Sequence, residues 1–158
     1  MKTYKKITTK QTIARLGWVR EAMVKAKKLE CTLDMRTENT FDHNCNTSAC
    51  VFGWAALSPK FKRIGVLSSS STGIYSHGRS EAEARKIWNY ASMGVRLIGL
   101  TDSETEALGD TNASNRIASA EDAYLPLNIN HFVTDNPTYD DVIEVIDLLI
   151  ERYKGQLL

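Results

Sequence analysis

Residues 41–57 change midway from polar and turn-forming to apolar, and they read Phe41-Asp42-His43-Asn44-Cys45-Asn46-Thr47-Ser48-Ala49-Cys50-Val51-Phe52-Gly53-Trp54-Ala55-Ala56-Leu57. The change predicts a loop that runs directly into a short buried helix. Thr47 or Ser48 would be the N-cap, because a hydroxyl there accepts from an unpaired backbone N–H, and Cys50 would lie in the first turn. Pro59 is expected to end the helix just after Ser58. The residues expected to face the core are Val51, Trp54, Ala55 and Leu57.

Length and composition are those of one soluble globular domain. The 158 residues are 42% hydrophobic and 25% charged, which predicts a single domain over residues 1–158. There is no run of about 18 apolar residues, so no membrane span is expected. The first six residues do not resemble a signal peptide. Three cysteines without an export signal favour free thiols over disulfides, and they favour the cytoplasm, the host's if the protein is phage-encoded.

Apolar spacing and capping signals predict helices at both ends of the chain. Thr8 and Thr9 can cap a first helix of about twenty residues, and Asn136-Pro137-Thr138 is a strong start for the last one. Capping boxes at residues 80–83 and 101–104 predict two further helices, which would end at Gly99 and Gly109. The expected core positions of the first and last helices are Ile13, Leu16, Val19, Met23, Ala26 and Leu29, and Val142, Val145, Ile146, Leu149 and Tyr153.

The intervening segments read as short or irregular structure. Residues 30–46 are expected to run extended, residues 60–67 to form a short strand or irregular chain, and residues 68–73 to form a Ser/Gly surface loop. A polar loop at residues 110–115 would precede a brief helix that starts at Ser119 and ends at Pro126. The predicted fold is therefore mainly α. It is a single compact domain of four to five helices with long irregular loops and room for one short hairpin.

The net charge of +1 conceals an uneven distribution along the chain. Residues 1–28 hold nine Lys or Arg against one Glu, whereas residues 101–158 hold twelve Asp or Glu against three basic residues. Lys10, Arg20 and Lys27 lie mostly on the polar side of the first helix and could contact nucleic acid or an acidic partner. The alternative is that the basic first helix packs near the acidic last one, so that the two fields cancel.

The cysteines are compatible with two kinds of chemistry, nucleophilic catalysis and metal binding. Cys50 at a helix N-terminus would have a lowered pKa, which favours the thiolate. His131 could act as its base, with Asp135 or Asn136 orienting the imidazole. Such a set would make the protein a cysteine-dependent hydrolase or transferase. A buried structural cysteine is the more common case. No catalytic residue is therefore assigned.

A metal site is the second option. Thiolate and imidazole ligands suit zinc, although the spacing is irregular, with neither a Cys-x-x-Cys pair nor a His pair, so no cofactor is assigned. A disulfide between Cys45 and Cys50 would need an oxidising compartment. The potential zinc ligands are Cys31, His43, Cys45 and Cys50.

A binding surface is the third kind of site. Aromatic and imidazole groups suit small-molecule pockets, and a Ser/Gly loop flanked by basic residues could wrap a phosphate. The alternative is that the tryptophans belong to the core and that the histidines are structural. The candidate binding residues are Lys10, Arg20, Lys27, His43, Thr47, Tyr75, His77 and Arg79.

Residues 45–55 resemble a motif of small bacteriophage and bacterial proteins that reads Cys-Gly-Thr-x-x-Cys-aliphatic-Ala-Gly-Trp/His-Ala. Asn46 and Phe52 depart from it, in place of Gly and Ala. The resemblance implies a phage origin and a helical fold but no mechanism, because the family has no settled activity. The motif residues expected to shape the fold are Cys45, Thr47, Cys50, Gly53 and Trp54. Further similarities are Phe41-Asp42, the start at Gly99-Leu100-Thr101 and the final helix after Pro137.

The leading functional hypothesis is a phage-type accessory protein that acts by binding. It would inhibit or sequester a component of the bacterial host, most plausibly of its antiviral defence, and the target could be a protein or a nucleotide signal. A homodimer is compatible with this role. The alternatives are a cysteine-dependent hydrolase or transferase using Cys50 and His131, and a nucleic-acid binder working through the basic first helix.

Overall fold

The computed structural model describes residues 6–33, 48–49, 51–64, 66–69, 73–76, 93–109, 113–126 and 137–158. The described part is mainly helical, as predicted. Its elements are α1 (Thr9–Lys28), β1 (Thr32–Leu33), β2 (Ser48–Ala49), α2 (Val51–Ala56), α3 (Pro59–Arg63), β3 (Val66–Ser69), β4 (Gly73–Ser76), the π-helix η1 (Met93–Ile98), α6 (Asp102–Gly109), α7 (Ala113–Asp122) and α8 (Tyr139–Gly155).

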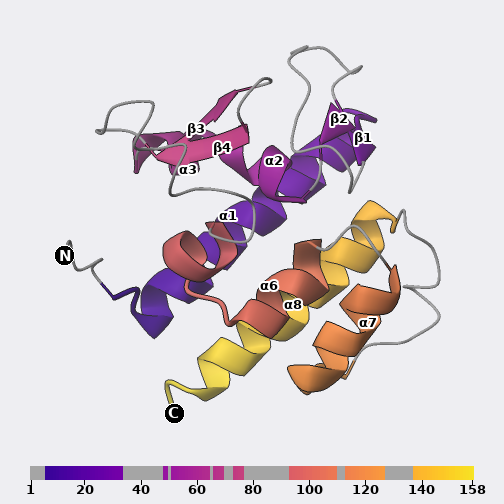
Figure 1. Cartoon of the computed structure of the whole chain (residues 1–158). Helices are drawn as coiled ribbons and strands as arrows, with labels where there is room; N and C mark the ends of the chain where they lie inside the picture. The colour runs from indigo at the N-terminus through magenta and orange to yellow at the C-terminus, as the bar shows by residue number, and fades with distance from the viewer. Residues whose placement is uncertain are drawn as a thin grey trace.

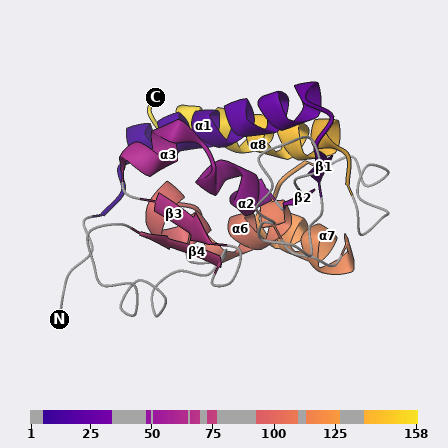
Figure 2. The same ribbon diagram turned by 90° about the horizontal axis from the view of Figure 1, so that it is seen from above.

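The two longest helices, α1 and α8, lie side by side in one layer (Figures 1 and 2). The shorter helices α2, α6 and α7 and the β3–β4 hairpin lie beneath them, and α3 lies next to α1 (Figure 2). No helix among the described residues is both long and apolar enough to cross a membrane.

Helix α1 forms where its sequence predicts, but the prediction of Leu29 as a core position was wrong, because Leu29 is the C-cap and is exposed. The hydroxyl of Thr8 accepts from the backbone N–H of Gln11, and the Gln11 side chain accepts from the N–H of Thr8. At the other end, the N–H groups of Glu30 and Cys31 donate to the carbonyls of Lys27 and Ala26, which is a Schellman ending. Glu30 takes the left-handed position with φ 54°, where glycine is more usual.

Helix α8 also follows its predicted pattern. Thr138 caps it reciprocally with Asp141, and the five predicted apolar positions are all buried. Two exposed ion pairs tie α8 to α1: Arg20 to Asp147 at 2.7 Å and Lys27 to Asp140 at 2.6 Å. The basic helix and the acidic helix therefore pack together, as the second interpretation of the charge distribution predicted.

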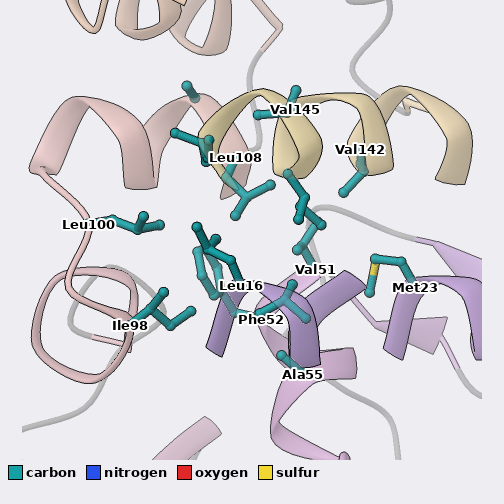
Figure 3. Packing of buried hydrophobic residues seen from close by; sticks show 14 of the residues in the cluster. Leu16, Met23, Val51, Phe52, Ala55, Ile98, Leu100, Leu108, Val142 and Val145 are labelled. Atoms are coloured by element: carbon teal, nitrogen blue, oxygen red, sulfur yellow. The ribbon is translucent and has the colours of Figure 1, made fainter. Parts of the chain in front are cut away.

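The core lies between α1, α2, α6 and α8 (Figure 3). Val51, Phe52 and Ala55 of α2 are fully buried and point into it, and Leu16 of α1 meets them there. Full burial of one such side chain contributes on the order of 1.5–3 kcal/mol, so these contacts supply much of the free energy of folding. Phe52, which stands where the motif has alanine, therefore fills the centre of the core.

The start of the predicted buried helix differs from expectation. Helix α2 begins at Val51, while Ser48 and Ala49 pair in parallel with Thr32 and Leu33. Ser48 lies three residues before the first residue of α2 and not directly before it, so the prediction of Ser48 as N-cap was wrong. Thr47 and Cys50 lie outside the described residues.

The segment after α2 is more regular than predicted. Helix α2 ends at Ala56, and Pro59 begins α3, since its fixed φ suits the first turn of a helix. Strands β3 and β4 form an antiparallel hairpin with Ser69 opposite Gly73. The short hairpin was thus predicted, although its strands extend into the segment expected to be a loop.

Two other boundaries were also misplaced. Helix α7 begins at Ala113, inside the predicted polar loop, and the part of the predicted 80–98 helix that is described, η1, is π-helical. η1 ends at Ile98, directly before Gly99, where the helix was expected to end. Gly99 has φ +91°, and a Cβ there would meet the Thr12 hydroxyl at 2.5 Å, so only glycine fits.

Candidate functional site

A groove about 370 Å³ in volume lies between α1 and the α2–α3 segment. We call it the Trp54 groove, after the largest side chain in its wall. Its α1 side is formed by Glu21, Ala22, Lys25, Ala26 and Leu29, and its other side by Trp54, Leu57, Ser58, Pro59, Lys60 and Arg63.

The helical repeat explains the α1 side. Its five residues recur along one face of the helix and extend over about 12 Å of its axis. The small side chains of Ala22 and Ala26 leave the space that the groove occupies, and Leu29, which is 49% exposed, adds an apolar end. The α1 side therefore combines small and apolar side chains with the charged Glu21 and Lys25.

The position of Trp54 is supported by a contact with Tyr139 of α8. The Trp54 side chain interacts with the Tyr139 hydroxyl, and that hydroxyl donates to the backbone carbonyl of Cys31 at 2.7 Å. Burial raises the pKa of Tyr139, so this hydroxyl stays protonated further into the alkaline range than an exposed tyrosine does. The contact with Tyr139 restrains the indole before a ligand binds, and such restraint reduces the entropic cost of binding.

Helix α3 is anchored to α1 at two points. The buried Phe61 ring meets Trp18 edge to face, with centroids 5.2 Å apart. Lys60 Nζ lies 2.9 Å from a carboxylate oxygen of Glu21, so an ion pair joins the two walls of the groove. Both contacts set the spacing between the walls.

The charge around the groove is predominantly positive. Lys25, Lys60 and Arg63 line it, against the single carboxylate of Glu21. Lys60 is paired with Glu21, whereas Lys25 and Arg63 have no ion-pair partner among the described residues. An apolar floor with cations above it suits a ligand that is apolar or aromatic at one end and anionic at the other.

The four predicted binding residues that the structure describes do not line the Trp54 groove. Lys10 is exposed on α1, Arg20 and Lys27 are engaged by the acidic residues of α8, and Tyr75 belongs to β4. The ion pairs reduce the charge that α1 offers to nucleic acid. The candidates outside the described residues are His43, Thr47, His77 and Arg79.

The cysteine hypotheses fall mostly on residues that are not described. Cys31 is buried at the end of α1, whereas His43, Cys45, Cys50 and His131 lie outside the described residues, so neither a zinc site nor a catalytic pair is tested. Within the described ranges no three His, Cys, Asp or Glu side chains are grouped to hold a metal ion. Of the motif residues, Gly53 is buried in α2, and Trp54 is half-buried in the groove wall.

A second polar cluster surrounds Glu104, which is only 3% exposed. Its carboxylate accepts from the backbone N–H of Thr101, from the Tyr153 hydroxyl and from Arg152 at 3.2 Å. Buried charge is tolerated when it is paired and hydrogen-bonded in this way. The cluster closes the capping box of α6 and ties it to α8, which makes it structural.

Comparison of the chain with models of protein families, with curated proteins and with solved structures finds no match. The candidate site therefore depends on geometry alone. Sequence reasoning placed Trp54 in the core and did not include Lys25 or Arg63 among the candidate binding residues. Their meeting in one groove depends on the packing of α3 against α1, for which the sequence offers no local signal.

Proposed function

We propose that the protein acts by binding, and that the Trp54 groove is its binding site. The observation that carries the proposal is a groove lined by Trp54, by apolar residues of α1, and by Lys25 and Arg63, which have no ion-pair partner in the part of the chain that the structure describes. Sites for small molecules and cofactors share this character: they are concave, mostly apolar and formed in advance, with a few charged groups that orient the ligand.

We further propose that the protein is a phage-type accessory factor that sequesters a host component, either a protein or a nucleotide signal of antiviral defence. The resemblance of residues 45–55 to the phage motif supports this setting. The same motif supplies Trp54, so the part of the chain that carries the resemblance also builds the groove wall. Sequestration requires binding without turnover.

The experiment compares two variants that add the same bulk at different places. Ala22→Phe fills the floor of the groove, whereas Ala118→Phe adds a ring at an exposed position of α7. Each protein is purified from producing cells under mild conditions and analysed by native mass spectrometry, with its fold checked by circular dichroism.

We expect the wild type and Ala118→Phe to retain a bound species that Ala22→Phe lacks. A wild type that carries nothing, or an Ala22→Phe variant that retains the same species, would contradict the proposal.

A further inference from the structure

The groove also indicates which class of ligand it takes. We infer that the ligand is a planar aromatic monophosphate of mononucleotide size, bound with its ring against Trp54 and its phosphate at Lys25 and Arg63. This inference rests on the proposed function, because it names the occupant of the same groove.

Size favours a small molecule over a protein segment. The volume of about 370 Å³ is near the lower end of the range for small-molecule sites, which is roughly 300–1,000 Å³. A stable protein partner would need to cover roughly 800 Å² of this chain. The two turns of α1 and the five residues of α3 that flank the groove are a small fraction of such a surface.

The shape favours a flat ring. Ala22 and Ala26 present only methyl groups on one side, and Trp54 presents an indole on the other. The interaction of the indole with Tyr139 and the position of Trp54 in α2 orient the ring along the groove wall. Stacking of a base on an aromatic side chain depends on the π-face and tolerates different bases, so loss of the indole should weaken binding about tenfold or more.

The charge favours a single phosphate group. Because Glu21 already neutralises Lys60, the rim offers the two remaining cations Lys25 and Arg63. A phosphate monoester carries about −1.5 to −2 charges at pH 7, which matches this pair. The Arg63 guanidinium can donate two parallel hydrogen bonds to phosphate oxygens, while Lys25 contributes a point charge.

The test titrates the full-length protein with AMP, GMP, CMP and UMP by isothermal titration calorimetry. Adenosine and inorganic phosphate are titrated separately, because each offers one half of the inferred ligand. We expect at least one of the four nucleotides to bind at least tenfold more tightly than adenosine or phosphate. Its affinity should fall with rising salt, since part of the binding is electrostatic.

Variants assign the contacts. Lys25→Gln with Arg63→Gln should weaken nucleotide binding about tenfold or more, while Lys6→Gln with Lys10→Gln removes the same charge from exposed positions outside the groove and should change it little. Trp54→Leu should also weaken binding. If Trp54→Leu unfolds, the charge variants still test the inferred phosphate contacts. They replace exposed side chains, so they should leave the fold intact.

Failure of this inference differs from failure of the proposed function. If no nucleotide binds more tightly than its separate halves, or the Lys25→Gln/Arg63→Gln variant binds as the wild type does, the inference is overturned. An Ala22-dependent species in native mass spectra would then leave the binding function standing and would identify the occupant by mass. A bound protein chain would point to an acidic protein segment instead.

Discussion

At the scale of single residues, Tyr153 shows how a core position can also carry a polar contact. Its ring belongs to the apolar stripe of α8 and is 7% exposed, while its hydroxyl donates to the buried Glu104 carboxylate. Burial raises the pKa of the Tyr153 hydroxyl above its usual 10.0, and the hydrogen bond to Glu104 raises it further. Protonation of this tyrosine is therefore coupled to folding.

The coupling predicts a loss of stability at alkaline pH. Above pH 10 the unfolded chain releases the Tyr153 proton while the native state keeps it, so the free energy of unfolding falls as the pH rises. The contribution is complete below pH 10. Between pH 9 and pH 11 the wild type should lose about 1 kcal/mol more than Tyr153→Phe, since one pKa unit corresponds to about 1.4 kcal/mol.

Urea denaturation at the two pH values, followed by circular dichroism, measures this difference. Tyr139 has a raised pKa as well, but it is present in both proteins and its effect cancels in the comparison. Equal losses in the wild type and in Tyr153→Phe would contradict the coupling.

The same scale shows what a sequence can and cannot reveal. Capping of α6 was predictable because Thr101 and Glu104 are three residues apart and satisfy each other's backbone N–H groups. The contacts of Glu104 with Tyr153 and Arg152 were not predictable, because those side chains come from a helix about fifty residues later in the chain. Trp54 was expected in the core, yet only part of its indole is covered, because α3 leaves a groove beside it.

At the scale of elements, the predictable helices are the ones with signals in their own sequence. α1 and α8 have reciprocal caps and regular apolar stripes, and both were located to within a few residues. α3 and the β1–β2 pair have no such signal: α3 is five residues long, and β1 and β2 have two residues each. Elements this short are stabilised by tertiary packing, which local patterns do not encode.

The contact between η1 and α6 supports a prediction about glycine. A Cβ on Gly94 would lie 2.8 Å from the Cβ of Thr105 and closer still to its methyl and hydroxyl groups. Thr105 is 1% exposed and its hydroxyl donates to the Thr101 carbonyl, so it cannot easily move. Gly94→Ala should therefore lower the free energy of unfolding by about 1–3 kcal/mol.

Gly17 provides the matched control. It lies within α1, and a Cβ there would meet nothing within 4 Å. Gly17→Ala should raise the free energy of unfolding by roughly 0.5–1 kcal/mol, because alanine loses less conformational freedom in a helix. Urea denaturation of both variants gives the two values, and a neutral Gly94→Ala would show that η1 can move away from α6.

At the scale of the whole molecule, the basic and acidic segments that lie far apart in the sequence are brought together by the fold. The basic first 28 residues and the acidic last 58 meet where α1 packs on α8, and the closest pairs are Arg20–Asp147 and Lys27–Asp140. Exposed ion pairs of this kind contribute little to stability, commonly below 1 kcal/mol. Their larger effect is on the field that α1 presents to a polyanion.

This compensation predicts how the protein responds to nucleic acid. Asp140→Asn with Asp147→Asn removes the acidic partners of α1, so the freed Arg20 and Lys27 should increase affinity for a short DNA duplex at 50 mM salt. Glu121→Gln with Asp122→Asn makes the same charge change on exposed residues of α7 and should have a smaller effect. Fluorescence anisotropy at several salt concentrations measures both, and binding through α1 should steepen the salt dependence. A wild type that already binds DNA tightly and with a steep salt slope would instead favour the basic helix as a nucleic-acid surface, because α8 would then be failing to neutralise it.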